Sequence, residues 1–89
     1  RLLHERGCRR LAAVMGPRET LSHGSRAAGF ADDAARLGDA AEVLHGGYDY
    51  QWGWEAGGRL LARADRPDGL FCGNDLIAIG IVDRWTKEG

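Results

Sequence analysis

The chain has 89 residues, with 12 basic and 13 acidic side chains and a formal net charge of -1 at pH 7. This length allows one small domain at most, near the lower limit of what a single hydrophobic core sustains. The scattered charges exclude a basic stripe that follows nucleic-acid phosphates, and no apolar run reaches the roughly 20 residues of a membrane span.

The first residues read as the end of a helix that is already under way. Gly7 closes the run RLLHERG, and the chain starts at Arg1 rather than Met, so we expect it to be cut from something longer. The apolar run Leu11–Met15 follows and ends at Gly16-Pro17. A continuous run of this length is typical of a strand covered on both faces, as in a parallel sheet.

The next segment predicts an amphipathic helix that begins at Ser22 as N-cap and stops at Gly38. Its apolar residues recur at three- and four-residue spacing: Ala27, Phe30, Ala31, Ala34 and Leu37. A second short strand is predicted from Glu42 to His45, before Gly46-Gly47.

Two more helices and one strand complete the prediction. A helix is expected from about residue 51 to 64, with apolar residues four apart: Trp52, Ala56, Leu60 and Ala64. Pro67 and Gly69 form a turn into a third strand, GLFC. The last helix is predicted to be capped by Asp75 and to end at Gly89. Its expected inner face comprises Ile77, Ala78, Ile81, Val82 and Trp85.

Helices and strands thus alternate along the whole chain. Such alternation predicts an α/β fold with a parallel sheet and right-handed helical crossovers. Three strands are few for this class and leave both sheet edges open, which again indicates truncation. Cys8 enters the first strand and Cys72 leaves the third, and strands about 16 Å long keep them too far apart for a disulfide. Reduced thiols favour a cytoplasmic location.

Polar segments follow each of the three strands: GPRETLSHGSR, GGYDY and GND. Ligands of open parallel sheets bind beyond the carboxyl ends of the strands, so these segments should converge on one site. Arg26 offers a fork of hydrogen-bond donors. Tyr48 offers an aromatic face for stacking, and Asn74 offers an amide that both donates and accepts hydrogen bonds. The alternatives are that Arg26 is an exposed surface arginine, that Tyr48 only packs against its neighbours, and that Asn74 only caps a helix.

Signatures of enzymes and nucleotide sites are absent: GxGxxG, GxxxxGK[ST], GxSxG and HExxH. We therefore predict no enzyme and no cofactor, with a flavodoxin-like enzyme as a lesser alternative. His23 and His45 fall near the ligand edge and could join Asp75 around a metal, but their spacing is not diagnostic, and no metal is predicted. Trp52 and Trp54 lie two residues apart, so only one of them can readily enter the core.

Four motifs carry a resemblance to a known family. They are G-x-R-R-L-A-x-V-x-G at residues 7–16, S-x-x-x-R-x-x-G-F at 22–30, G-x-Y at 46–48 followed by a glycine at 53, and P-D-G-L-F-C-x-N-D-x-x-A-x-G at 67–80. In this order and spacing, the chain resembles the effector-binding core of the lac-repressor family of bacterial transcription regulators. It resembles their sugar-binding periplasmic relatives less closely.

The resemblance implies a truncated subdomain of the periplasmic-binding-protein-like (type I) class. Residues 1–89 would form part of the C-terminal subdomain, with the DNA-binding headpiece and the first subdomain absent. In this family a small effector binds in the cleft between two subdomains, and its binding alters the affinity for operator DNA. The resemblance therefore implies an effector-binding part of a regulator. The alternative is a periplasmic sugar-binding protein of a transport system, which an upstream helix-turn-helix would exclude.

The resemblance also assigns roles to individual residues. Family effector contacts carry over to Ser22, Arg26, Tyr48 and Asn74. Thr20 falls where purine-responsive members have an Arg, which favours a sugar or related polyol as effector. Members are usually homodimers, and the expected contacts are Trp52, Trp54 and Ile79.

Overall fold

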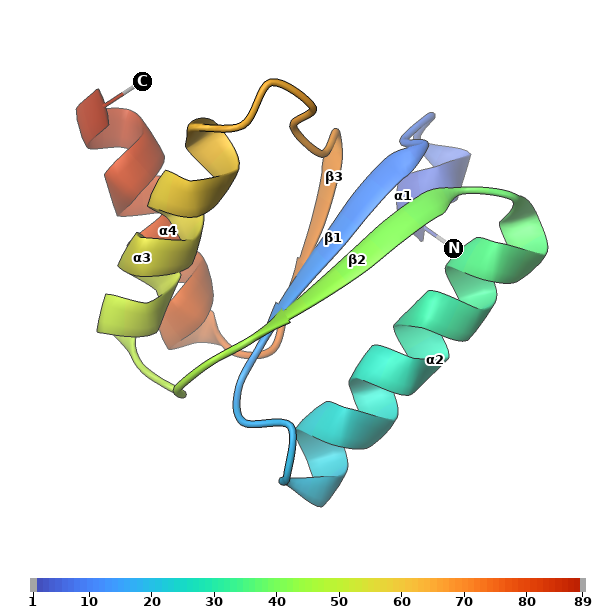
Figure 1. Cartoon of the computed structure of the whole chain (residues 1–89), viewed down its shortest axis with the longest axis horizontal. Helices are drawn as coiled ribbons and strands as arrows, with labels where there is room; N and C mark the ends of the chain where they lie inside the picture. Colours follow the sequence, from blue (N-terminus) through green and yellow to red (C-terminus); the bar gives the residue numbers. More distant parts are fainter. Residues whose placement is uncertain (1, 89) are drawn as a thin grey trace.

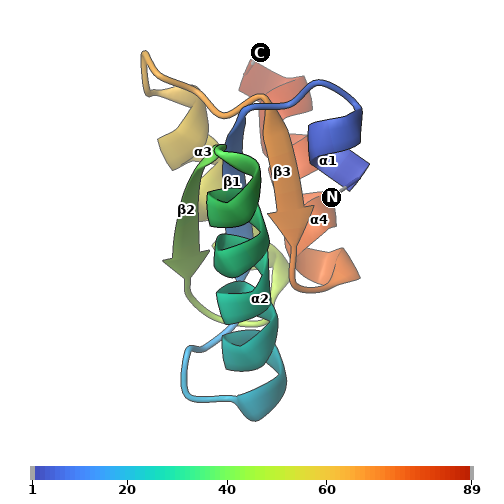
Figure 2. The same ribbon diagram turned by 90° about the vertical axis from the view of Figure 1, so that its right-hand side faces the viewer.

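A three-stranded parallel sheet lies between two layers of helices (Figure 1). The computed structural model describes residues 2–88. In chain order the elements are α1 (Leu2–Glu5), β1 (Arg10–Met15), α2 (Leu21–Leu37), β2 (Ala40–His45), α3 (Tyr50–Leu61), β3 (Gly69–Cys72) and α4 (Asp75–Glu88). Helix α2 covers one face of the sheet, and α3 and α4 cover the other (Figures 1 and 2). The predicted α/β fold with alternating elements is confirmed, whereas the predicted stop at Gly89 lies outside the described residues.

Strand β1 is the centre of the sheet, which has the order β2-β1-β3. Both of its pairings are parallel, and they align Met15 with His45 and Val14 with Cys72. Residues 11–16 are all buried, because helices cover both faces of this strand. The continuous apolar run therefore does mark a strand covered on both sides.

Alternate residues of β1 serve two separate cores, as the two-residue period of a strand requires. On the α3 and α4 face, the buried residues are Val14, Trp52, Ala56, Leu60, Ile77 and Ile81. On the α2 face, Ala13, Met15 and Ala27 are buried, with Phe30, Val43 and Phe71 packed against them. Burying one Leu or Ile side chain fully contributes about 1.5–3 kcal/mol, so these two clusters are the main source of stability.

Several details of the helix predictions were wrong. Val82 is 58% exposed and lies on the outer side of α4 with Ile79, since five residues separate it from Ile77 and helical faces repeat every 3.6. Helix α3 ends at Leu61, so Ala64 is not part of it. The Arg63 amide donates to the Leu60 carbonyl, and this tighter bond closes the last turn. On α2, the predicted inner residues Ala31 and Leu37 are exposed.

The predicted glycine stops after α1 and α2 are confirmed. Gly7 and Gly38 have positive φ angles of 93° and 78°, a conformation that glycine adopts without steric cost. After α2, the Asp39 amide donates to the Ala34 carbonyl and the Gly38 amide to Ala35, which satisfies the last carbonyls of the helix. These stops turn the chain back toward the amino ends of β1 and β2. None of the helices in the described part of the chain is long and apolar enough to cross a membrane.

The carboxylate of Asp68 joins the start of β1 to the turn before β3. It accepts hydrogen bonds from the backbone amides of Arg10 and Arg9, and these bonds hold the pKa of Asp68 below its ordinary value. The Cys8 thiol donates to the Asp68 carbonyl at 3.2 Å, whereas Cys72 pairs with β1 at the other end of the sheet. The predicted separation of the two cysteines is therefore confirmed.

Helices α3 and α4 pack backbone against backbone through glycines. A Cβ atom on Gly53 would lie 2.1 Å from the carbonyl oxygen of Ile77, and one on Gly80 would lie 2.3 Å from that of Tyr50. Real Cβ atoms do not approach other atoms so closely. Helices α3 and α4 can stay this close only while positions 53 and 80 both lack a side chain.

Gly80→Ala is expected to lower the free energy of unfolding by about 1–3 kcal/mol, because the added methyl group must push α3 and α4 apart. Gly29→Ala on α2 is the matched control, since a Cβ there meets nothing within 4 Å. That change should be neutral or stabilise the protein by up to about 1 kcal/mol. Urea unfolding followed by circular dichroism measures both variants. Equal effects would contradict the close packing.

Candidate functional site

The loops that follow the three strands start side by side at the carboxyl edge of the sheet. The Gly46 amide donates to the Met15 carbonyl at 3.1 Å, and the Gly73 amide donates to the Val14 carbonyl at 2.9 Å. We call the surface formed by residues 16–26, 46–49 and 73–75 the carboxyl rim. The predicted convergence of these three segments is confirmed.

Arg26 reaches from α2 to the loop after β3. Its Nη1 donates to the Gly73 carbonyl at 3.1 Å, and its guanidinium carbon lies 5.5 Å from the centre of the Phe71 ring. Phe71 in turn stacks on Phe30, so the guanidinium rests on an aromatic surface. One of its five N–H donors is used in this way. The remaining donors are available to a ligand on the rim.

Asn74, rather than Asp75, is the cap of α4. The Oδ1 atom of Asn74 accepts from the Ile77 amide at 2.9 Å, and its Nδ2 donates to the Tyr48 carbonyl at 3.0 Å. A cap must accept from the amide three residues later, and Asp75 is itself the first residue of the helix. The prediction for Asp75 was therefore wrong. Asn74 keeps one N–H donor and one acceptor position for a ligand.

Tyr48 and His23 meet at the middle of the rim. Tyr48 is 44% exposed, and its ring stands edge-on to the His23 ring, with 5.2 Å between centres. His23 is only 6% exposed, and its Nδ1 accepts from the Gly16 amide at 2.7 Å. On the other side of Gly16, His45 Nδ1 lies 2.9 Å from the carbonyl oxygen and donates to it. Two histidines thus hold the Gly16 residue between them.

The start of α2 differs from its prediction. Thr20 occupies the N-cap position in an extended conformation, and its hydroxyl donates to the Pro17 carbonyl at 2.7 Å. This turn starts the helix two residues earlier than expected, so Ser22 lies exposed within the first turn. The assignment of Ser22 as N-cap was wrong. Thr20 and Ser22 nevertheless both belong to the carboxyl rim.

The sequence placed His23 near this edge but did not reveal its burial. A Cβ on Gly73 would lie 2.6 Å from the His23 ring, and one on Gly16 would lie 2.9 Å from it. The ring fills a space that these two glycines leave open. The available signals were the three-residue spacing between His23 and Arg26, which places them on one helix face, and the glycines after two strands.

The two tryptophans of α3 point to different surroundings. Trp52 is 6% exposed, and its Nε1 donates to the Met15 carbonyl at 2.9 Å, so it belongs to the core and leaves little surface for a partner. Trp54 is half-buried beneath the Arg84 guanidinium, 5.1 Å away. The prediction that one of the two enters the core is confirmed. We call the exposed or half-buried apolar residues Tyr50, Trp54, Leu76, Ile79 and Val82 the α3–α4 outer surface.

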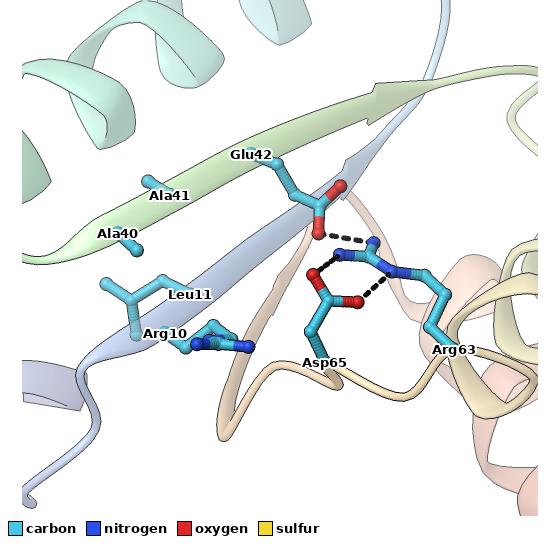
Figure 3. Close-up of a pocket in the computed structure, with 7 residues that line it drawn as sticks. All are labelled: Arg10, Leu11, Ala40, Ala41, Glu42, Arg63 and Asp65. Atoms are coloured by element: carbon cyan, nitrogen blue, oxygen red, sulfur yellow. Dashed lines mark hydrogen bonds and ion pairs between the residues drawn. The ribbon is translucent and has the colours of Figure 1, made fainter.

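A hollow of about 360 Å³ lies at the opposite, amino-terminal edge of the sheet (Figure 3). Its lining residues are Arg10, Leu11, Ala40, Ala41, Glu42, Arg63 and Asp65. Arg63 donates to both Glu42 and Asp65, and the bond from Arg63 lowers the pKa of Asp65. The carboxylates and Arg63 satisfy one another. This hollow shares no residue with the carboxyl rim.

Residues 2–88 hold no group of three or more His, Cys, Asp or Glu side chains placed to bind a metal ion. The Nδ1 atom of His23 accepts from the Gly16 amide, so that nitrogen is not available to a metal ion. Burial raises the pKa of the Cys72 thiol, so this group stays protonated rather than becoming a thiolate nucleophile. The side chains of the rim offer hydrogen-bond donors and acceptors and the exposed ring of Tyr48.

Comparison with known proteins gives the family. The periplasmic binding protein-like domain matches residues 1–89. The HTH-type transcriptional repressor PurR of Erwinia tasmaniensis is 34% identical over 92 residues, which cover 100% of this chain and 27% of that protein. The repressor of the same name from Escherichia coli is 31% identical over the same lengths. The chain thus spans 27% of the length of these curated relatives.

Solved structures agree on the fold. A LacI family transcriptional regulator from Bifidobacterium animalis has a TM-score of 0.90 and 31% identity over 98% of this chain and 32% of that one. A putative transcriptional regulator LacI from Bacillus cereus has a TM-score of 0.94 over 99% of this chain and 32% of that one, at 23% identity. The fold is that of an α/β unit of the periplasmic-binding-protein-like class. The chain belongs to the periplasmic binding protein-like domain family, and along its whole length it is similar to part of LacI-family transcriptional regulators.

Asn74→Ala is expected to lower the free energy of unfolding by about 1–2 kcal/mol, because it removes the helix cap and the bond to Tyr48. Asn74→Asp should cost less, since Asp caps helices as well as Asn and only the donation to Tyr48 is lost. Hydrogen exchange of the Ile77 amide reports the cap directly. It should accelerate in the Ala variant and stay slow in the Asp variant, and equal acceleration would contradict the assigned cap.

Proposed function

We propose that residues 1–89 are part of the C-terminal subdomain of a two-subdomain effector-binding core, and that the effector is a sugar. The observation that carries this proposal is the meeting of Arg26, Tyr48 and Asn74 on the carboxyl rim. Membership of the family supports the effector-binding role. The chemistry of the rim supports the choice of a sugar.

A sugar needs several hydrogen-bonding groups and one apolar surface for its ring face. The unused donors of Arg26 and the remaining amide positions of Asn74 suit hydroxyl groups. The exposed ring of Tyr48 suits stacking on the apolar face of a sugar ring. Thr20 places a short hydroxyl, already donating to Pro17, where purine-responsive members have an Arg. The rim therefore favours a neutral polyol over a purine base.

The effector would act by shifting the population of two conformations. A sugar held by this rim and by the first subdomain stabilises the closed cleft, and it shifts the equilibrium only as far as its affinities for the two states differ. The coupled rotation changes the spacing of the DNA-binding headpieces, and with it the affinity for operator DNA in the cytoplasm. A periplasmic sugar-binding protein would share this rim. The likeness to HTH-type repressors along the whole chain favours the regulator.

Arg26→Ala in the intact regulator should weaken binding of the recognised sugar about ten- to a hundredfold, because hydrogen bonds from a charged group contribute roughly 1.5–3 kcal/mol. Arg36→Ala is the control, since Arg36 lies on the same helix and pairs with Asp33 away from the rim. Thermal-shift titrations with D-ribose, D-glucose and D-galactose, and with adenine and guanine in parallel, provide the measurement.

The titrations test the assigned site and the proposed class of ligand separately. Sugar-induced stabilisation that is unchanged in Arg26→Ala would contradict the assigned site. Stabilisation of the unmodified regulator by a purine base, but by no sugar, would contradict the proposed effector class.

We also propose a homodimer that forms through the α3–α4 outer surface. Leu76, Ile79 and Val82 are each at least half exposed and lie three residues apart, so they make an apolar stripe along α4. Tyr50 borders the stripe and donates to Asp83 at 2.9 Å, a bond that raises the pKa of Tyr50. A contiguous exposed apolar stripe is typical of a surface that a second copy covers.

Ile79→Asp is expected to weaken dimerisation of the intact regulator by tenfold or more, since it places a charge in the middle of the apolar stripe. Leu37→Asp introduces the same charge at an exposed apolar residue on the opposite face of the sheet, and should leave the dimer intact. Sedimentation equilibrium measures both. Dimers of equal strength in the two variants would place the interface elsewhere.

A further inference from the structure

His23 is the feature of the rim that neither the motifs nor the family membership assigns. We infer that it positions the rim and contacts the effector: with Nδ1 bonded to the Gly16 amide, its ring presents the Nε2 proton to an acceptor oxygen of the bound molecule. This inference rests on the proposed function of the rim. It adds a hydrogen-bond donor to the proposed site.

The hydrogen bond from Gly16 fixes the tautomer of His23. The Gly16 amide donates to Nδ1 at 2.7 Å, and a nitrogen that accepts a hydrogen bond carries no proton. In a neutral imidazole the proton must then reside on Nε2. His23 is thus set by the backbone of its own protein as an Nε2–H donor.

That donor faces the surface of the rim. No hydrogen bond within residues 2–88 uses Nε2. Among the described residues, Nε2 is also not one of the fully buried side-chain atoms that lack a hydrogen-bond partner. The ring is 6% exposed, with Gly16, Gly73 and Tyr48 packed closely around it. The small accessible part of His23 therefore includes its proton-bearing nitrogen. Arg26, three residues later on α2, supplies donors on the same helix face.

Two substitutions separate the functions of the two ring nitrogens. In His23→Asn, the side-chain oxygen can replace Nδ1 as acceptor for Gly16, but no donor remains at the position of Nε2. In His23→Gln, the amide can reach the position of Nε2 but leaves Gly16 without its partner. We expect His23→Asn to melt close to the unmodified regulator, and His23→Gln to melt at a lower temperature.

Binding is measured with D-ribose, D-glucose and D-galactose on the intact regulator. His23→Asn should bind the recognised sugar about tenfold more weakly, as expected for one lost hydrogen bond. A merely structural histidine would leave sugar affinity unchanged in a variant that keeps its melting temperature.

The tautomer is tested without any sugar, by nitrogen-15 NMR of histidine-labelled regulator. A proton on Nε2 of His23 supports the inference, and a proton on Nδ1 overturns it. If a sugar binds the unmodified regulator and His23→Asn equally well, the inference fails while the proposed function stands. If none of the three sugars binds the unmodified regulator, the proposed function fails, and the contact from His23 fails with it.

Discussion

The parallel pairing of β2 and β3 with β1 is the constraint on which the rest of the structure depends. Since both neighbours run in the direction of β1, and the registers align Met15 with His45 and Val14 with Cys72, all three strands end at one edge of the sheet. An antiparallel neighbour would send its following loop to the other edge. The convergence of Arg26 and Asn74 is thus a consequence of topology before it is a property of either side chain.

Each strand is followed by a glycine, and packing explains all three. Gly16 and Gly73 leave room for the ring of His23, and a Cβ on Gly46 would lie 2.3 Å from the ring of Trp52. These large rings lie directly on the backbone where the strands end. They fix the loops after β1, β2 and β3 to one another, so the rim is held together by buried rings as well as by surface polar contacts.

The sequence was sufficient for features that depend on repeating local patterns. Alternating apolar segments predicted every helix and strand, and glycines predicted the ends of α1 and α2, because these signals act within one element. The caps were misplaced: Ser22 and Asp75 are plausible cap residues, but a cap is defined by hydrogen-bond geometry at one specific position. The burial of His23 depends on Gly16 and Gly73, and the second of these is fifty residues away in the chain. Spacing along one helix carries no information about such a contact.

The hollow and the proposed ligand-binding side chains lie at opposite edges of the sheet. At the amino edge, the guanidinium of Arg63 is engaged by Glu42 and Asp65, so the hollow in Figure 3 has an arginine whose charge is already matched. On the carboxyl rim, Arg26 has a backbone carbonyl and an aromatic ring as its partners within the described residues. The carbonyl and the ring stabilise the positive charge of Arg26 but do not neutralise it. In the proposed two-subdomain core, this rim is one wall of a cleft, and a single wall is an open surface rather than a cavity. The proposed site is therefore characterised by side-chain donors and acceptors that have no partner within the described residues, as the proposed hydroxyl-rich ligand would require.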